Sequence, residues 1–336
     1  MTVPIVDSLS RLQPDDTFVV VCRKRLQAMF FGMKNVETVT ADFTGQRHGM
    51  RGVVSLYREL HRRYRIDAVI DLQDVLRTRL LSALLRIAGV PVYRIDYGRR
   101  EKRRLRFRGW QQSKQLPTEF ERYAQTFQKS GLKTDEHFRA LPVNATAAAA
   151  VEERYGRKQG SWIGIAPFAK SKTNMLPYRI TKEVMQHYAG LPDTRVWLFG
   201  AGEIECEILR QWASVLPNVV SVAGQLPLEE ELELMRKLDV MLCMDSANQH
   251  LASIVGLRAV SVWCGTHPYT GFYGWNQRSE DRLEMPLSCR PCTNHGRNRC
   301  LYGNYLCKQF TAEEVIRKMD IETETTRTTE TTNKNV

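Results

Sequence analysis

Short apolar runs alternate with amphipathic segments along most of the chain, and this alternation limits the possible folds more than any other feature. In the first half, the apolar runs Thr17–Cys22, Asp67–Leu72 and Pro91–Asp96 predict buried strands. The segments Gly49–Tyr64 and Val75–Gly89 have helical spacing of their apolar residues. A βαβα order of this kind favours a parallel sheet that helices cover on both faces.

The same order starts again after an Ala-rich stretch near residue 145. The strands predicted there are Ser161–Phe168, Thr194–Gly202, Val240–Asp245 and Ala259–Gly265, and the helices are Thr181–Gly190, Glu203–Leu216, Pro227–Asp239 and Ala247–Gly256. We therefore predict two tandem, doubly wound, Rossmann-like α/β domains, 1–155 and 156–320, that bind ligands at the carboxyl ends of their strands. Segment 321–336 is Thr-rich, has no apolar periodicity, and is expected to be disordered.

Basic residues are concentrated in the first half of the chain. The whole chain carries a net charge of +12, and residues 1–155 hold 28 Lys and Arg against 17 Asp and Glu. Such a half should attract an anionic partner: nucleic acid, lipid headgroups or an acidic substrate. A solvated basic surface without a dedicated ligand is the alternative.

The run "RREKRRLRFR" at 99–108 is the densest part of this charge. Nucleic-acid-binding arms have this composition, and so do phosphate-binding faces and solvated loops. No helix-turn-helix, zinc-finger or RNA-binding pattern accompanies the run, which disfavours nucleic acid as the partner.

The cysteines and the lack of an export signal indicate a cytoplasmic protein. No apolar run is long enough to span a bilayer, and the eight cysteines fit a reducing compartment. The last four cysteines follow the spacing C-x2-C-x7-C-x6-C: Cys289, Cys292, Cys300 and Cys307. Four thiolates could hold a structural zinc ion, but the second pair is spaced too widely for a standard ribbon. We expect reduced thiols here, or two disulfides formed on handling, and no metal or cofactor, with zinc as the alternative.

The stretch "MDSANQHLASIVG" places polar residues where a predicted strand turns into a helix. Asp245, Ser246 and Ala247 stand at this junction, where unsatisfied N–H groups and the helix dipole favour negative charge. Ser246 and the backbone could hold a diphosphate, and Asp245 could accept bonds from sugar hydroxyls. A simple N-cap explains the spacing equally well. His250 lies one turn further on the face of Ser246, where a satisfied core histidine is the alternative.

Two further loops follow predicted strands. Gly200 and Gly202 allow a tight turn in "LFGAGEIE", and Glu203 or Glu205 could reach a ribose hydroxyl. Capping of the next helix explains Glu203 equally well. In "IAPFAKSK", Lys170 or Lys172 could supply a point charge to a departing diphosphate, or both could be surface lysines.

Several of these segments together resemble one enzyme family. "DSANQHLASIVG" followed by "GTHP", with "IAPFAKSK", "LFGAGEIE" and "DLQDVLRTRLLSALLRIAG", is similar to glycosyltransferase family 9, the ADP-heptose:lipopolysaccharide heptosyltransferases. The similarity runs over most of residues 1–320. It implies a GT-B fold, in which two Rossmann-like domains face a cleft. It also implies inverting, metal-independent transfer from an ADP-sugar to a lipopolysaccharide core acceptor, at the cytoplasmic face of the inner membrane.

The resemblance assigns roles to individual residues. The donor would be held by Asp245, Ser246, Ala247, His250, Gly265, Thr266, His267, Gly200 and Glu203, the last two from the weaker glycine-turn match. The acceptor side of the cleft would include Asp71, Asp74 and Arg77. Lys172 would be the catalytic cation.

The chain departs from the family pattern at two places. Family members have a strand and a Gly-Asp loop just before a helix that contains "MTVP", whereas this chain begins at that tetrapeptide. We expect a start codon further upstream, which would restore the aspartate that deprotonates the acceptor; a catalytically inactive nucleotide-sugar-binding protein is the alternative. The second departure is Asn174, which stands where the family often has a lysine, so that Lys172 is the candidate to replace its charge.

Overall fold

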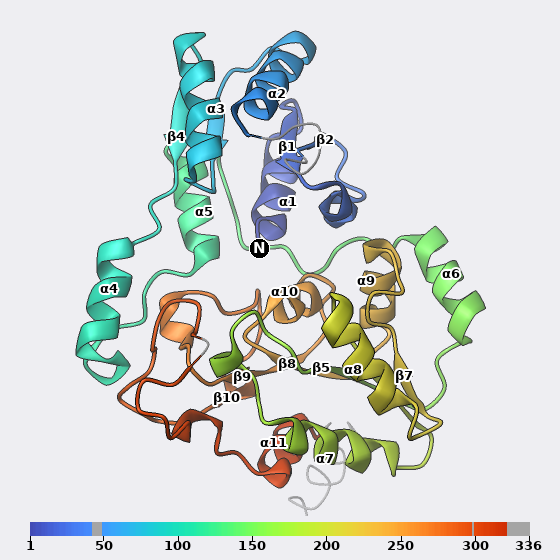
Figure 1. Cartoon of the computed structure of the whole chain (residues 1–336). Coiled ribbons are helices and arrows are strands. Elements are labelled where there is room, and N and C mark those ends of the chain that lie inside the picture. The colour runs from blue at the N-terminus through green and yellow to red at the C-terminus, as the bar shows by residue number, and fades with distance from the viewer. Residues whose placement is uncertain (42–48, 298, 321–336) are drawn as a thin grey trace, which may run out of the picture.

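The chain folds into two α/β halves that lie one above the other in Figure 1. The structure, a computed structural model, describes residues 1–41, 49–297 and 299–320. The predicted disordered segment 321–336 lies outside these residues. None of the described helices has the length and apolar character needed to cross a bilayer.

The first half contains two separate pairs of parallel strands. β1 (Phe18–Cys22) pairs with β2 (Val36–Thr40), and β3 (Val69–Asp71) pairs with β4 (Val92–Arg94). The three predicted strands are thus confirmed as β1, β3 and β4, whereas β2 is not predicted from the sequence. Among the described residues, no ladder joins the two pairs into one sheet. The helices of this half are α1 (Val3–Leu12), α2 (Gly49–Arg63), α3 (Leu76–Ile87), α4 (Arg99–Arg108) and α5 (Glu119–Gln128).

The basic run 99–108 forms helix α4. It begins after Gly98 and ends at Gly109, with φ angles of 59° and 80° that favour glycine over other residues. Only Lys102 and Leu105 within the helix are buried. Apolar periodicity is therefore almost absent, and the sequence pattern predicts no helix here.

The second half contains one parallel sheet of six strands in the order β10-β9-β8-β5-β6-β7. The central strands β5, β8 and β9 are buried on both faces, as expected where helices cover both sides. The strands are β5 (Ser161–Ala166), β6 (Thr194–Leu198), β7 (Val219–Ser221), β8 (Val240–Met244), β9 (Ala259–Trp263) and β10 (Arg282–Glu284). The helices are α6 (Ala145–Tyr155), α7 (Tyr178–Ala189), α8 (Glu203–Ala213), α9 (Leu228–Arg236), α10 (Ala247–Ile254) and α11 (Ala312–Met319).

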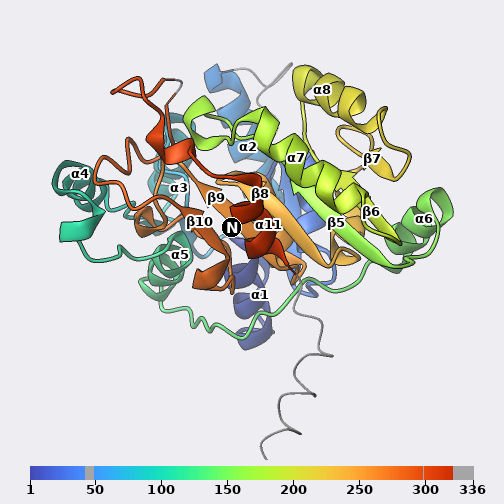
Figure 2. The same cartoon turned by 90° about the horizontal axis from the view of Figure 1, so that it is seen from below.

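Alternate side chains of the central strands enter two different cores. Ile163 and Ile165 pack with residues of α7, α8 and α11 on one face. Trp162 and Ala166 pack on the other face, in a cluster that also contains residues of α1, α9 and α10. This second cluster extends from the sheet into the first half, so the two halves share one continuous apolar core. Figure 2 shows the sheet from the side of α7 and α11.

Helix α6 packs with the second half, whereas the predicted boundary assigns residues 145–155 to the first. Glu152 of α6 forms an ion pair at 2.7 Å with Lys237, which follows α9. The Glu233 carboxylate of α9 also accepts the backbone N–H of Asn144, just before α6, at 3.0 Å.

Candidate functional site

Three loops of the second half meet where the strand order of the sheet reverses. In the order β10-β9-β8-β5-β6-β7, the reversal lies between β8 and β5, and ligands of such sheets bind at the carboxyl ends of the strands there. The loop after β5 contains the short helix η4 (Lys172–Asn174), β8 is followed by Asp245, and β9 is followed by Gly265 and Thr266.

The Asp245 carboxylate holds these loops together. Its Oδ2 accepts hydrogen bonds from the Thr266 hydroxyl at 2.7 Å and from the Asn174 amide at 3.3 Å. Its Oδ1 accepts from the Gln249 amide of α10 at 3.1 Å. Burial raises the pKa of Asp245 to about 6, while the bonds from Thr266 and Gln249 act in the opposite direction. The carboxylate is thus engaged inside the protein and positions the loops around it.

The start of α10 presents polar atoms without partners. Ser246 occupies the N-cap position but makes no capping hydrogen bond, and its buried hydroxyl has no partner. His250, one turn further, has a buried Nδ1 that is also unpartnered. Burial, and secondarily the charge of the amino terminus, lowers the pKa of His250 to about 3. A hydroxyl donor beside the first N–H groups of a helix suits a phosphate oxygen. Ala247, the first residue of the helix, is exposed.

The loop after β9 lies directly against η4. The Gly265 N–H donates to the Thr173 carbonyl at 3.0 Å. A Cβ atom at Gly265 would lie 2.7 Å from Thr173 Oγ1, so a larger residue would push the two loops apart. Only glycine permits this close approach without a shift of the backbone.

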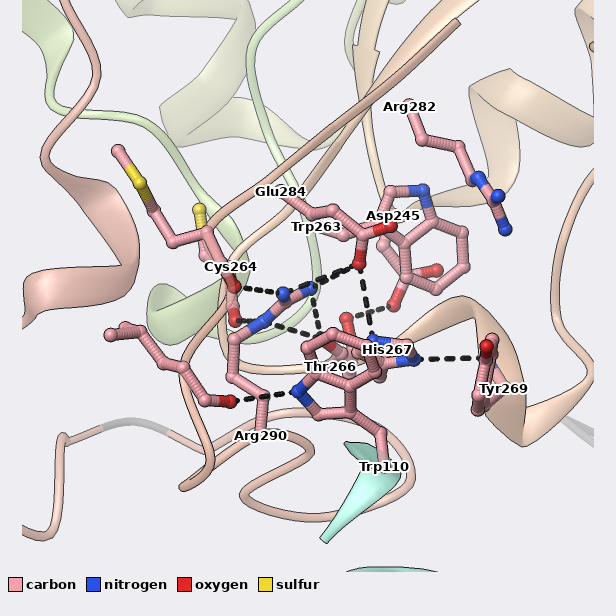
Figure 3. A network of polar contacts seen from close by, with 12 residues as sticks. Trp110, Asp245, Trp263, Cys264, Thr266, His267, Tyr269, Arg282, Glu284 and Arg290 are labelled. Carbon is pink, nitrogen blue, oxygen red and sulfur yellow. Dashed lines mark hydrogen bonds and ion pairs between the residues drawn. The ribbon is translucent and has the colours of Figure 1, made fainter. Parts of the chain in front are cut away.

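His267, in contrast, is enclosed by protein groups. Its Nδ1 accepts the Tyr269 backbone N–H at 3.1 Å, which leaves the proton on Nε2. Nε2 lies 3.2 Å from Glu284 Oε2, without the alignment of a hydrogen bond. Trp110 stacks on the ring at a centroid distance of 4.8 Å, as Figure 3 shows. Burial, reinforced by the charge of Arg290, lowers the pKa of His267 to about 3. The ring is therefore neutral at physiological pH and supports the loop from within.

Arg290 supports the same loop from below. Its buried guanidinium donates to the carbonyl oxygens of Cys264 at 2.7 Å and Thr266 at 3.0 Å, and it pairs with Glu284 at 3.2 Å (Figure 3). Neither Arg290 nor Trp110 is predicted as a site residue from the sequence. Arg290 stands between Cys289 and Cys292, two candidate metal ligands, and Trp110 comes from the other half of the molecule.

The lysine loop has an exposed cation and a buried anchor. The Lys172 side chain is exposed, while Thr173 and Asn174 are buried. Thr173 exchanges hydrogen bonds with Arg297, and the Ser171 hydroxyl donates to the His295 carbonyl at 2.8 Å. The segment around residues 295–297 therefore covers this loop, which no sequence signal indicates. Burial lowers the pKa of His295, and the charges of Lys102 and Lys170 lower it further.

The glycine turn after β6 is closed by Glu205 and not by Glu203, for which capping is the alternative role. Glu205 Oε2 accepts the Ala201 N–H at 3.0 Å and so closes the turn. A Cβ atom at Gly200 would lie 2.9 Å from Leu209, which explains the glycine there. Glu203 is exposed at the start of α8, and its role toward a ribose stays a prediction.

The predicted acceptor-side residues lie together after β3. Asp71 is buried, and its Oδ1 accepts the backbone N–H groups of Gln73 and Asp74, both at 3.0 Å. Arg77 is exposed in the first turn of α3.

Asp74 forms ion pairs with three arginines: Arg79 at 2.7 Å, Arg94 at 3.3 Å and Arg99 at 3.0 Å. These contacts, above all the bond from Arg79, lower the pKa of Asp74. Arginine thus dominates this corner of the first half.

All eight cysteines are free thiols. Burial raises the pKa of Cys307 to about 11, and the neighbouring Cys292 adds to the shift. In the described part of the chain, no three histidine, cysteine or acidic side chains are placed to hold a metal ion. Their placement therefore lends no support to the zinc alternative, which stays a prediction without a test.

Comparisons with solved structures identify the architecture. The chain superposes on the glycosyl transferase family 9 protein from Veillonella parvula with a TM-score of 0.74 and 16% identity, covering 94% of this chain and 91% of that one. For the Escherichia coli ADP-heptose lps heptosyltransferase II, the TM-score is 0.63 at 16% identity, with 93% and 92% covered. For E. coli heptosyltransferase WaaC with ADP, it is 0.61 at 16% identity, with 94% and 93% covered. These likenesses confirm the predicted GT-B fold.

Sequence comparison assigns the family. A comparison with curated proteins finds no match. The family model described as glycosyltransferase family 9 (heptosyltransferase) matches residues 53–302, which is well over half of the chain. This range includes the η4 loop, Asp245 and the loop after β9. The chain therefore belongs to glycosyltransferase family 9.

Proposed function

We propose that the protein transfers a heptose, or a related sugar, from an ADP-sugar to an anionic lipopolysaccharide core acceptor, with inversion at the anomeric carbon and without a metal ion. The observation that carries this proposal is the meeting of three loops at the strand-order reversal, where Asp245 joins Asn174 to Thr266 beside an unpartnered Ser246 hydroxyl. Membership of glycosyltransferase family 9 supports the choice of reaction.

The donor diphosphate would lie at the start of α10. Ser246 Oγ would donate to a phosphate oxygen, and the first N–H groups of the helix would supply further donors. Lys172, exposed at the edge of the same loops, would add positive charge as the phosphate departs. The protein's own donors would thus supply the charge stabilisation that a metal ion provides in other transferases.

The transfer itself would be a direct displacement. The acceptor hydroxyl oxygen forms a bond to the anomeric carbon while the bond from that carbon to the β-phosphate oxygen breaks. The electron pair leaves with ADP, and the hydroxyl proton passes to a general base. The family resemblance implies an aspartate for this base. Asp71 and Asp74 are bound by backbone N–H groups and arginines, which favours a positioning role for both.

The acceptor would enter from the first half, which carries most of the positive charge. The arginines around Asp74 would attract acceptor carboxylates or phosphates, and Arg77 is exposed beside them. A lipid-linked acceptor would place the enzyme at the cytoplasmic face of the inner membrane.

A sugar-transfer assay tests the proposal. The full chain is incubated with ADP-heptose and a heptose-deficient lipopolysaccharide core, and both ADP release and the mass of the product are measured. We expect ADP release, a product heavier by one sugar, and the same rate with EDTA present. UDP- and GDP-sugars should react at least about tenfold more slowly if the site reads the adenine nucleotide.

Calorimetry with ADP separates the possible failures. Donor binding without transfer would assign the chain to the alternative function, a nucleotide-sugar-binding protein that has lost catalysis. No binding of ADP or ADP-heptose would overturn the donor site altogether.

A further inference from the structure

Helix α4 presents a strongly basic face that the proposed reaction does not use. Its ten residues include six arginines and a single acid, Glu101, which pairs with Arg122 at 2.8 Å. Arg99 pairs with Asp74. The remaining arginines are exposed and form no ion pair with another described residue: Arg100, Arg103, Arg104, Arg106 and Arg108. Five cations on one short helix therefore lack a counter-charge from the described part of the chain.

The opposite face of α4 fixes this orientation. Lys102 is buried, pairs with Glu119 of α5, and has its Nζ 4.5 Å from the centre of the Phe272 ring. Leu105 is 1% exposed. Breaking a buried ion pair is costly, so the helix cannot turn its arginines inward. The first half and the second half both contribute to this anchor.

An exposed aromatic residue lies among the arginines. The Phe107 side chain is 70% exposed, and the guanidinium carbons of Arg103 and Arg106 lie 5.6 and 5.3 Å from its ring centre. Helices that bind in the interfacial plane of a bilayer combine a cationic face with such apolar side chains. In both Figure 1 and Figure 2, α4 lies at the outer edge of the molecule, where a flat surface can reach it.

We propose that the exposed face of α4 docks the protein on an anionic lipid bilayer. Arg100, Arg103 and Arg104 would bind headgroup phosphates, and Phe107 would enter the boundary between headgroups and acyl chains. The inference deepens the proposed function, on which it rests for the presence of a membrane-bound acceptor. It also has a structural consequence. Gly109 follows α4 directly, and Trp110 after it stacks on His267, so a docked α4 holds the loop after β9 at a fixed place relative to the bilayer.

Vesicle sedimentation tests the docking without donor or acceptor. The full chain is mixed with phosphatidylcholine vesicles that either contain or lack phosphatidylglycerol. We expect binding only to the anionic vesicles, and weaker binding as salt increases. The triple variant Arg100→Gln, Arg103→Gln and Arg104→Gln should bind about 100-fold more weakly, at roughly fivefold for each arginine. Phe107→Ser should weaken binding several-fold with no change in charge.

A matched triple variant controls for net charge. Arg51→Gln, Arg58→Gln and Arg62→Gln removes three exposed arginines from α2 and should change vesicle binding far less. Equal losses in the two triple variants would overturn the proposal in favour of diffuse attraction. Unchanged vesicle binding in the α4 variant would overturn it as well. Salt-sensitive binding to an oligonucleotide, lost in the α4 variant while vesicles are not bound, would assign the helix to nucleic acid instead.

Two further readouts separate this inference from the proposed function. ADP affinity should be the same in the α4 variant and the unsubstituted protein, which shows that the donor site is intact. A protein that binds anionic vesicles through α4 but transfers no sugar would support the docking and defeat the proposed reaction.

Discussion

The Thr266 hydroxyl donates a 2.7 Å hydrogen bond to Asp245 Oδ2, and this single contact joins the ends of β9 and β8. The same carboxylate reaches Asn174 after β5 and Gln249 in α10. One side chain therefore contacts each of the three loops, after β5, β8 and β9, that would surround the donor diphosphate. The two oxygens of Asp245 accept three hydrogen bonds. Their contribution can be tested by removing both oxygens in one variant and replacing one of them in another.

Asp245→Ala should weaken ADP binding by at least about tenfold and lower the free energy of unfolding by about 2 kcal/mol, because it leaves buried donors without acceptors. Asp245→Asn should retain most of both, since its Oδ1 can still accept from Thr266. Its amide can donate to Gln249 Oε1, which is buried and unpartnered, once the Gln249 side-chain amide turns over, because Gln249 Nε2 is the atom that now bonds to Asp245. Calorimetry and chemical denaturation measure the two effects, and the exposed Asp67→Ala serves as the control. Unchanged ADP affinity in the alanine variant would defeat the donor-site assignment.

The pH dependence of stability should reflect the buried groups around this site. His250 and His267 have pKa values lowered to about 3, so between pH 3 and 6.5 the unfolded chain binds more protons and stability rises with pH. Each histidine contributes about 1.4 kcal/mol per pH unit. The pKa of Asp245 is raised to about 6, so this residue acts oppositely between about pH 4 and 6. Asp245→Asn should therefore steepen the rise by about 1.4 kcal/mol per pH unit in that interval. Urea denaturation at several pH values measures the slope, and parallel curves for the two proteins would contradict the shifted pKa.

The parts of the site that follow strand ends are predictable from the sequence. Asp245 and Ser246 directly follow an apolar run, so local pattern alone places them at the carboxyl edge of a parallel sheet. The loops around Lys172 and Gly265 follow strands in the same way. Their convergence then depends only on the strand order, which the βα rhythm limits to few possibilities.

Contacts between segments that are distant in the sequence cannot be predicted from local sequence patterns. Trp110 and His267 lie in different halves of the chain, far apart in the sequence, and no periodicity links the two residues. Helix α4 escapes prediction because its charges remove the apolar stripe that marks a surface helix. The single sheet predicted for the first half differs from the two observed strand pairs, since no described segment provides a strand between β1 and β3.

Lys172→Ala should lower the turnover number by at least about tenfold and leave stability within about 0.5 kcal/mol, because the side chain is exposed. Lys170→Ala is the matched variant, removing an exposed lysine two residues earlier whose charge acts on His295. Steady-state kinetics of both variants decide which lysine serves the departing ADP. A normal rate for Lys172→Ala combined with a slow Lys170→Ala would move the catalytic charge to Lys170.

Trp110 should position the loop after β9 through its stack on His267. Trp110→Ala removes the cover from the imidazole, so water reaches the ring and the pKa of His267 should rise from about 3 toward its ordinary value. The same opening should raise the KM for the donor several-fold and change kcat little, because Trp110 contacts the loop and not the reacting atoms. Trp110→Phe keeps an aromatic face over the ring, and both the pKa and the KM should stay close to those of the unsubstituted protein. An NMR titration of the histidine resonances follows the pKa directly. A larger KM with an unmoved His267 pKa would show that Trp110 acts by some contact other than this stack.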